Sequence, residues 1–368
     1  IPVALHGAVI ANQIKIKKGK LRGEPSNGML CSLEEMGFEA SSIPKEFDDG
    51  ILILDEIYPL GISILEALKI DKAVIEFEIT PNRSDCLSMI GMANEIAASF
   101  DLSVQAPKVY HESAPSEIEK YATVVVEDET LCPRYVAKVV KDVNIKPSPL
   151  WLQLRLMQAG MRPINNIVDI TNYVMLEYGQ PIHAFDFEAV ENGKIVVKRA
   201  NENEVFTTLD DKERMLSSDM LMIADGRKNI AIAGVMGGAN TEIKETTKTI
   251  IIEIASFDKS SVRKTSKQLG LRTEASSRFE KGVSYDLPLV VSDRICYLIE
   301  QLEAGIIVPG RIDVYPNPQA QKVIPYSVEE INKVIGSQLS EAEMILCLSK
   351  LGIETIQDNG LADRKSVV

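Results

Sequence analysis

The sequence predicts an α+β protein built from several domains, and three observations favour this fold class. The chain has 368 residues, 45% of them hydrophobic, which is enough to bury more than one core. Segments with strand and helix patterns are mixed without the regular alternation of a doubly wound sheet. Polar stretches that contain proline, at residues 106–118 and 315–318, divide the chain further.

Residues 1–72 consist of short apolar segments separated by glycines. We expect strands at residues 3–5, 9–10, 14–16 and 51–54, with Gly7, Gly19, Gly23 and Gly28 between segments. This pattern is typical of part of a small β-barrel.

Residues 73–112 predict a small α+β segment. A strand at residues 74–80 leads into a turn at residues 81–85, and a helix follows from about Leu87 to Phe100. Asp85 is the expected N-cap, because its carboxylate can accept hydrogen bonds from the free amides of the first turn. Residues 106–118 are expected to form a linker.

The longest region, residues 119–312, predicts a mixed α+β module. Apolar runs indicate strands at residues 122–126, 134–141, 194–198, 220–224, 229–233 and 249–254, with Asp225-Gly226 as a turn signal between two of them. A helix is expected to start with Ser148 as N-cap and Pro149 at the first helical position, and to end at Gly160. A second helix is expected at residues 166–177.

Beyond the boundary at residues 315–318, two further helices are expected, opening at Ser327 and at Ser340. Residues 319–368 therefore predict the start of another α+β unit, and their last segment has the pattern of a strand. Because the chain begins at Ile1 rather than at a methionine and stops within this strand, we expect it to be a piece of a longer protein.

The formal net charge of −13 disfavours nucleic-acid binding by the chain as a whole. Contact with a phosphate backbone would have to come from local basic patches, of which the sequence has two. The first consists of Lys15, Lys17, Lys18, Lys20 and Arg22, and the second of Arg263, Lys264, Lys267, Arg272, Arg278 and Lys281. Either patch taken alone is more often a solvated cationic surface.

The sequence contains no pattern typical of a membrane-spanning segment or a metal site. No segment approaches the roughly 18 apolar residues that span a bilayer, and no leader pattern opens the chain. The five cysteines are scattered without the spacing of a zinc site or a disulfide framework. We therefore expect a soluble, cytoplasmic protein.

Three polar clusters in the third region are candidates for a functional site. Residues 165–173 and 179–186 join a polar helix to a Gly-Pro loop with His183, although a capped helix and a structural histidine are the plainer alternative. Residues 231–238 place glycines after an apolar strand, where they allow close approach to the backbone or simply form a tight loop. Residues 250–254 and 271–282 include Glu253, which either faces solvent or is buried and needs a hydrogen-bond donor.

The signatures of other chemistries are missing from the sequence. It has no phosphate-binding glycine loop, no nucleophile elbow, no zinc-protease motif and no recognisable cysteine–histidine pair. Residues 264–267 faintly resemble the lysine loop of class I synthetases but lack its histidine partner motif, so a basic helix surface is the better interpretation. Covalent and metal-assisted mechanisms have no support.

Six strings, in order, resemble the β subunit of bacterial phenylalanyl-tRNA synthetase over essentially the whole chain. They lie at residues 20–32, 79–88, 165–172, 179–186, 234–238 and 271–282. The resemblance implies that residues 1–72 are part of a tRNA-binding oligonucleotide-binding fold and that residues 73–112 are part of a discontinuous N-terminal domain. It also implies that residues 113–315 are an editing module, an aminoacyl-tRNA deacylase, and that residues 319–368 begin a further domain.

The resemblance implies a pocket that hydrolyses phenylalanine tRNA mischarged with tyrosine. Its lining matches Thr171, Asn172, His183, Gly234, Gly237, Glu253, Thr273 and Ala275. Glu253 would receive the tyrosine hydroxyl, and Ala275 would leave room for the ring. The glycines, His183 and Asn172 would hold the amino acid and the attacking water. The expected tRNA contacts are Lys264, Lys267, Arg272 and Arg278.

The resemblance also implies partners. These are an α subunit, in a heterotetramer of two α and two β subunits, together with phenylalanine tRNA and tyrosine. ATP and Mg²⁺ are implied for the whole enzyme but no cofactor or metal for this chain, which alone would be at most an ester hydrolase without amino-acid activation. The alternatives are a non-catalytic RNA-binding and assembly scaffold, or a free-standing amino-acid-binding or trans-editing protein. Convergence of Glu253 and His183 on one pocket would favour editing over the scaffold.

Overall fold

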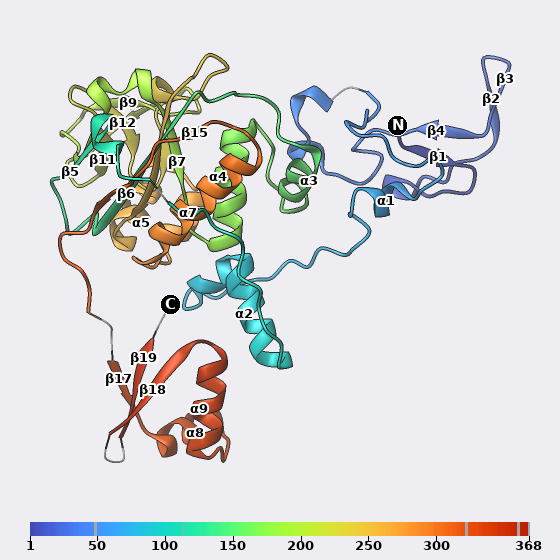
Figure 1. Ribbon diagram of the computed structural model, residues 1–368. Coiled ribbons are helices and arrows are strands. Elements are labelled where there is room, and N and C mark those ends of the chain that lie inside the picture. The colour runs from blue at the N-terminus through green and yellow to red at the C-terminus, as the bar shows by residue number, and fades with distance from the viewer. Residues whose placement is uncertain (48–49, 113, 321–322, 359–360, 367–368) are drawn as a thin grey trace. The chain divides into compact units, whose positions relative to one another are not determined.

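The chain folds into two units, each assembled from two separate stretches of sequence. The computed structural model describes residues 1–47, 50–112, 114–320, 323–358 and 361–366 (Figure 1). The first unit comprises Ile1–Glu78 and Ile145–Tyr173, and the second comprises Ile79–Asn144 and Val174–Val368. The elements form a mixed α+β structure with several separate sheets, which confirms the predicted fold class. The finer division into four domains stays a prediction.

The described strands of the first unit form two separate antiparallel pairs. β1 (Val3–Leu5) pairs with β4 (Gly28–Leu30), and β2 (Gly19–Leu21) pairs with β3 (Glu24–Ser26), both antiparallel. The strands expected at residues 9–10, 14–16 and 51–54 are wrong, since these segments form no ladder and Val9 and Lys15 make one isolated bridge. Short apolar runs need a neighbouring strand edge to become strands, and the described part of this unit offers them none. Its strands consequently close no barrel by their pairing.

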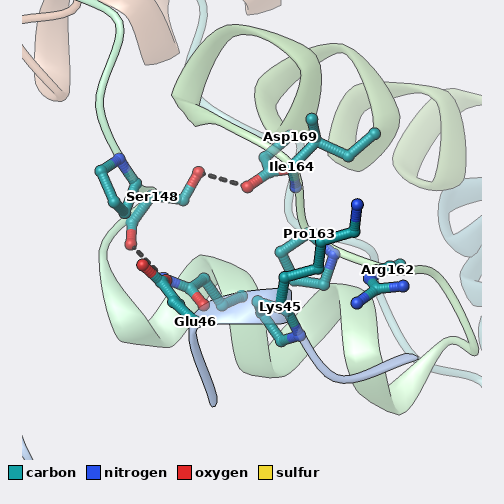
Figure 2. Close-up of a pocket in the computed structure, with 10 residues that line it drawn as sticks. Lys45, Glu46, Ser148, Arg162, Pro163, Ile164 and Asp169 are labelled. Atoms are coloured by element: carbon teal, nitrogen blue, oxygen red, sulfur yellow. Dashed lines mark hydrogen bonds between the residues drawn. The ribbon is translucent and has the colours of Figure 1, made fainter. Parts of the chain in front are cut away.

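The core of the first unit joins its two stretches of sequence. Leu33, Ile43 and Leu52 pack with side chains of α3 (Leu150–Gln158). This helix has Pro149 rather than Ser148 as its N-cap, which corrects the predicted start. The hydroxyl of Ser148 instead donates to Oδ2 of buried Asp169 at 2.6 Å, as Figure 2 shows.

The helix after residue 87 begins as expected but is capped differently. α2 (Met89–Phe100) has Ser88 as its N-cap, and the Ser88 side chain accepts a hydrogen bond from the Gly91 N–H. Asp85 lies one turn earlier, in a 3-10 helix over Ser84–Leu87, where its carboxylate binds the guanidinium of Arg83. Asp85 is therefore not the cap. The strand expected at residues 74–80 is also absent.

Two five-stranded sheets dominate the second unit (Figure 1). One has the order β13-β12-β11-β8-β5, and the other the order β15-β6-β14-β7 with β16 also paired to β6. Their bounds are β5 Thr123–Val126, β6 Arg134–Lys141, β7 His183–Asp186, β8 Lys194–Arg199, β11 Leu221–Ala224, β12 Asn229–Ile232, β13 Met236–Gly237, β14 Ile250–Ser256, β15 Ile306–Ile307 and β16 Ile312–Val314. All six strands predicted for this region are confirmed, whereas β7, β13, β15 and β16 were not predicted. A single hydrophobic core contains residues of both sheets.

Three helices of the second unit follow β14 directly along the chain. They are α5 (Lys259–Leu269), α6 (Glu274–Phe279) and α7 (Leu287–Gln301), and α7 packs against β6 and β14. α4 (Asn166–Tyr178) confirms the helix expected at residues 166–177 and crosses the boundary between the two units. A small hairpin joins β9 (Val205–Thr207) to β10 (Glu213–Met215).

The last part of the chain forms a three-stranded sheet with two helices. β17 (Val323–Tyr326), β19 (Leu361–Ser366) and β18 (Ile353–Asp358) lie in that order. α8 (Val328–Ile335) and α9 (Glu341–Lys350) are capped by Ser327 and Ser340, as predicted. Within the described ranges, no helix combines the length and the apolar character needed to cross a bilayer.

Candidate functional site

The antiparallel pairing of β7 with β14 brings the two chemically most distinctive predicted residues together. His183 and Glu253 are direct cross-strand partners, so their side chains lie on the same face of the sheet. Both line a cavity of about 70 Å³, room for roughly five water-sized groups, which is on the scale of one side chain. The lining consists of Pro181, Ile182, His183, Ala231, Ile232, Gly234, Val235, Met236, Gly237, Glu253, Ala275 and Phe279.

Glu253 is buried rather than facing solvent. Its residue is 7% exposed, and Oε2 accepts a hydrogen bond from the hydroxyl of Tyr135 at 2.8 Å. Burial raises the pKa of its carboxyl to about 7, while the bond from Tyr135 acts in the opposite direction. Within the described residues no donor reaches Oε1, so one oxygen remains for a ligand.

His183 supplies a neutral imidazole beside this carboxylate. Burial lowers the pKa of its side chain to about 4, so the ring carries no charge at neutral pH. Its centroid lies 4.6 Å from that of Phe185 in an edge contact. A neutral imidazole has one nitrogen that can accept a proton or orient a water, which is what a hydrolytic site needs.

Two glycines allow the loop after β12 to lie against this pair. Gly237 faces the His183 ring so closely that an added Cβ would lie 2.5 Å from Cε1 and 2.6 Å from Nε2. Gly234 has a φ of +68°, a left-handed conformation that side chains rarely adopt. No residue larger than glycine fits at position 237 unless His183 moves.

The start of α6 holds this loop in place. Thr273 caps the helix by accepting from the Ser276 N–H, and its hydroxyl donates to the carbonyl of Val235 at 2.8 Å. The hydroxyl is thus committed to the protein, and Thr273 acts as a tether between α6 and the loop. Ala275, in the first turn of α6, lines the cavity.

Other predicted site residues lie elsewhere. Thr171 and Asn172 belong to α4 in the first unit, where the Thr171 hydroxyl donates to the carbonyl of Val168. Lys264 and Lys267 are exposed on α5, and Arg272 is exposed in the loop that follows. Arg278 differs from these, because it is buried and pairs with the Glu274 carboxylate at 2.6 Å.

A larger cavity, of about 430 Å³, lies in the first unit and contains no predicted site residue. Figure 2 shows Lys45, Glu46 and Arg162 around it, with Asp169 at its wall. Burial raises the pKa of Asp169 to about 6, and its two oxygens accept from Ser148 and from the Ile164 N–H. This carboxylate is therefore occupied in holding the surrounding loops.

One cluster resembles a metal site by composition. Asp85, Cys86 and Glu95 place their ligand atoms within 4.8 Å of one another. The guanidinium of Arg83, however, bonds to both carboxylates, so the positive charge in this cluster comes from the protein.

Comparisons with known proteins show the family of this chain. A model of the B3/4 domain matches residues 131–304, which include β7, β14 and the glycine loop. The phenylalanine–tRNA ligase β subunit of Clostridium tetani is 47% identical over 356 residues, which is 96% of this chain and 44% of that protein. The β subunits of Clostridium acetobutylicum and Bacillus subtilis are 49% and 45% identical, each also over 96% of this chain and 44% of their own length. The chain belongs to the phenylalanine–tRNA ligase β-subunit family.

Members of this family are subunits of an aminoacyl-tRNA synthetase, an enzyme of translation, as the sequence predicted. The chain spans less than half the length of the β subunits it matches. A solved N-terminal fragment of the phenylalanyl-tRNA synthetase β subunit of Pyrococcus horikoshii also matches, with 16% identity and a TM-score of 0.36, over 77% of this chain and 78% of that chain.

Two residues beside the site of this β-subunit chain were missed from sequence. Tyr135 lay within a predicted strand, and nothing in the order of residues linked it to Glu253, 118 positions away. Gln180 is fully buried, and its side-chain amide donates to the carbonyls of Pro181 and Ala255, which anchors the loop before β7 to β14. A polar residue between Gly179 and Pro181 was the only available signal.

We predict that Gly237→Ala displaces the His183 ring, because the added methyl group would lie far inside contact distance of Cε1 and Nε2. The displaced imidazole gains solvent, so its pKa rises from about 4 toward the ordinary value of 6.5. An NMR titration of His183 measures this change. Gly226→Ala is the control, since its Cβ would meet only Glu191 at 3.7 Å. An unchanged His183 titration in Gly237→Ala would contradict the packing described.

We predict that Glu253→Gln gains stability over the wild type as pH rises. The folded pKa of about 7 exceeds the ordinary 4.5, so the stability supplied by this group is present at low pH and lost between about 4.5 and 7. Glutamine does not titrate and keeps the acceptor for Tyr135. The difference in unfolding free energy should move by about 1–3 kcal/mol in favour of the variant across this range.

Calorimetric unfolding at several pH values tests this prediction. Glu188→Gln, at an exposed position, is the control and should show no such trend. The lowered pKa of His183 makes the unfolding free energy of all three proteins rise with pH. This contribution is the same in each protein, so it cancels when the unfolding free energies are subtracted. A pH-independent difference between Glu253→Gln and the wild type would show that Glu253 is not desolvated.

Proposed function

We propose that this chain carries the editing site of a phenylalanine–tRNA ligase β subunit, which hydrolyses phenylalanine tRNA mischarged with tyrosine. The observation that carries the proposal is the pairing of a buried carboxylate, Glu253, with a neutral imidazole, His183, on one wall of a small cavity. The scaffold alternative required this cavity to be absent or filled by core side chains, so the geometry favours editing.

Discrimination would come from the hydroxyl that separates tyrosine from phenylalanine. An apolar pocket cannot strongly reject an isostere that only adds a hydroxyl, and it discriminates by roughly 10²-fold. A pocket built to bond that hydroxyl rejects the analogue lacking it by about 10⁴ or more. Oε1 of the buried Glu253 carboxylate would be an acceptor of this second kind. Phenylalanine would leave it without a donor.

Hydrolysis requires a positioned water and stabilisation of the developing oxyanion, and it needs no covalent intermediate. The free nitrogen of neutral His183 can accept a proton from that water or orient it. Gly234 lines the cavity, and within the described residues its N–H has no hydrogen-bond acceptor, which supports a role in binding a ligand oxygen. Thr171 and Asn172 of α4 belong to the proposed set only through the family resemblance.

The remaining assignments extend the same proposal. Residues 1–72 would be part of an oligonucleotide-binding fold, 73–112 part of a discontinuous domain, 113–315 the editing module and 319–368 the start of a further domain. Exposed Lys264, Lys267 and Arg272 would contact tRNA, while buried Arg278 would support α6 rather than touch the ligand. The β subunit would assemble with an α subunit, as a heterotetramer of two α and two β subunits in the cytoplasm. The whole enzyme would use ATP and Mg²⁺, with no amino-acid activation by this chain.

The test is deacylation of phenylalanine tRNA charged with tyrosine or with phenylalanine, at low ionic strength. Salt is kept low because a chain of charge −13 holds a polyanion through local patches alone. Wild type should release tyrosine faster than phenylalanine. The double variant Glu253→Ala, His183→Ala should lose at least about tenfold in tyrosine release, since a hydrogen bond to a charged group contributes about 1.5–3 kcal/mol.

The matched control is the double variant Glu188→Ala, His111→Ala, which removes an exposed glutamate and an exposed histidine of the same unit. It should keep the wild-type rates. Equal tyrosine release by the wild type and the Glu253–His183 double variant would support the scaffold instead.

A further inference from the structure

We propose that Tyr135 positions Glu253 in the editing pocket. Its hydroxyl holds one carboxylate oxygen, so that only the other oxygen is presented to the hydroxyl of the substrate. Tyr135 is then a specificity-determining residue that never touches the substrate, and this inference rests on the proposed function.

The strand register allows Tyr135 to reach Glu253. Across the ladder Glu253 is opposite Ala137, and Tyr135 is opposite Ala255, so Tyr135 and Glu253 are diagonal neighbours on one face. Diagonal neighbours lie about 7–8 Å apart, within reach of an aromatic side chain only if nothing bulky stands between them. The two alanines leave that space. A larger side chain at either position would obstruct the contact.

The bond fixes the orientation of the carboxylate. Tyr135 is 0% exposed, so its hydroxyl cannot exchange Glu253 for water, and the oxygen–oxygen distance is 2.8 Å. With Oε2 held and Oε1 free of protein donors in the described part of the chain, Glu253 offers a single acceptor to the cavity. Preorganisation of this kind reduces the cost of ordering the site when the ligand binds.

The same hydroxyl favours the ionised form of Glu253. A phenol that donates to a carboxylate stabilises its charge and opposes the effect of burial on the pKa. The other titratable groups facing Glu253 are His183 on β7 and Cys132 just before β6. β12, the glycine loop and α6 contribute only uncharged residues to the cavity lining.

Only Glu253 should titrate near neutral pH in this site. Burial lowers the pKa of His183 to about 4, while burial raises the pKa of the Cys132 thiol and that of the Tyr135 phenol well above their usual ranges. A pH-dependent preference for tyrosine between about pH 5.5 and 9 therefore reports the charge of Glu253.

The experiment measures binding of L-tyrosine and L-phenylalanine to the full chain by calorimetry across this pH range. The ratio of their Kd values cancels the contribution of the ammonium and carboxylate groups that both ligands share. In the wild type, the preference for tyrosine should increase as the pH rises, with a midpoint near pH 7. In Tyr135→Phe the midpoint should move up by about one pH unit or more, because the ionised carboxylate has lost its donor.

Tyr121→Phe is the matched control. Tyr121 packs against the same core, but its hydroxyl accepts a hydrogen bond from Lys141 and does not line the cavity. The variant should therefore keep the wild-type dependence of tyrosine preference on pH. A purely structural role for Tyr135 would lower stability and leave the midpoint unchanged, which would overturn the inference. A wild type with no tyrosine preference at any pH would overturn the proposed function itself.

Replacement of Tyr135 by 3-fluorotyrosine keeps the test decisive if Tyr135→Phe fails to fold. The fluorinated phenol is more acidic and donates a stronger hydrogen bond, so the midpoint should move down rather than up. A midpoint that stays at the wild-type value in this protein would equally overturn the inference.

Discussion

A buried carboxylate in the middle of β14 is the constraint on which the site depends. Burying an ionised group without a partner costs several kcal/mol, and Glu253 has no cation beside it in the cavity lining. Among the described residues, the hydroxyl of Tyr135 is its hydrogen-bond donor, and burial raises its pKa to about 7 despite this bond. The surrounding elements accommodate this group: alanines on β6 and β14 leave room for Tyr135, and burial keeps neighbouring His183 neutral.

The same cost of burial would make Glu253 selective between tyrosine and phenylalanine. A fully satisfied carboxylate would gain little from a ligand hydroxyl, whereas a free oxygen of a buried carboxylate can distinguish ligands with a hydroxyl from ligands without one. The cationic residues available for a phosphate backbone, Lys264, Lys267 and Arg272, are exposed on or beside α5 and do not line the cavity. In the proposed function, different residues would therefore bind the tRNA and recognise the amino acid.

The sequence predicted the parts of the fold that have strong local signals. The long apolar strands of the second unit and the capped helices after Ser327 and Ser340 follow from periodicity and capping chemistry. β7 was missed because it has four residues, two of them His183 and Asp186, and becomes a strand only by pairing with β14. Conversely, the short apolar runs at residues 9–10, 14–16 and 51–54 were expected to be strands and form no ladder.

Some residues of the site could likewise be identified from the local sequence, whereas others depend on tertiary contacts. Glu253 was identified as unusual because a carboxylate among β-branched residues needs an explanation, but the sequence left its burial open. Tyr135 could not be identified, since its role depends on a diagonal contact across a register that only the folded sheet defines. Ser88 and Asp85 are both good capping residues, and only the backbone geometry selects Ser88.

The most direct test of this account is a crystal structure of the chain soaked with tyrosine. The account predicts that the ring enters the cavity between Ala275 and the glycine loop, with the phenol oxygen about 2.6–3.0 Å from Oε1 of Glu253 and Tyr135 still bonded to Oε2. Tyrosine bound with its hydroxyl directed away from Glu253, or bound only in the larger cavity of the first unit, would contradict it.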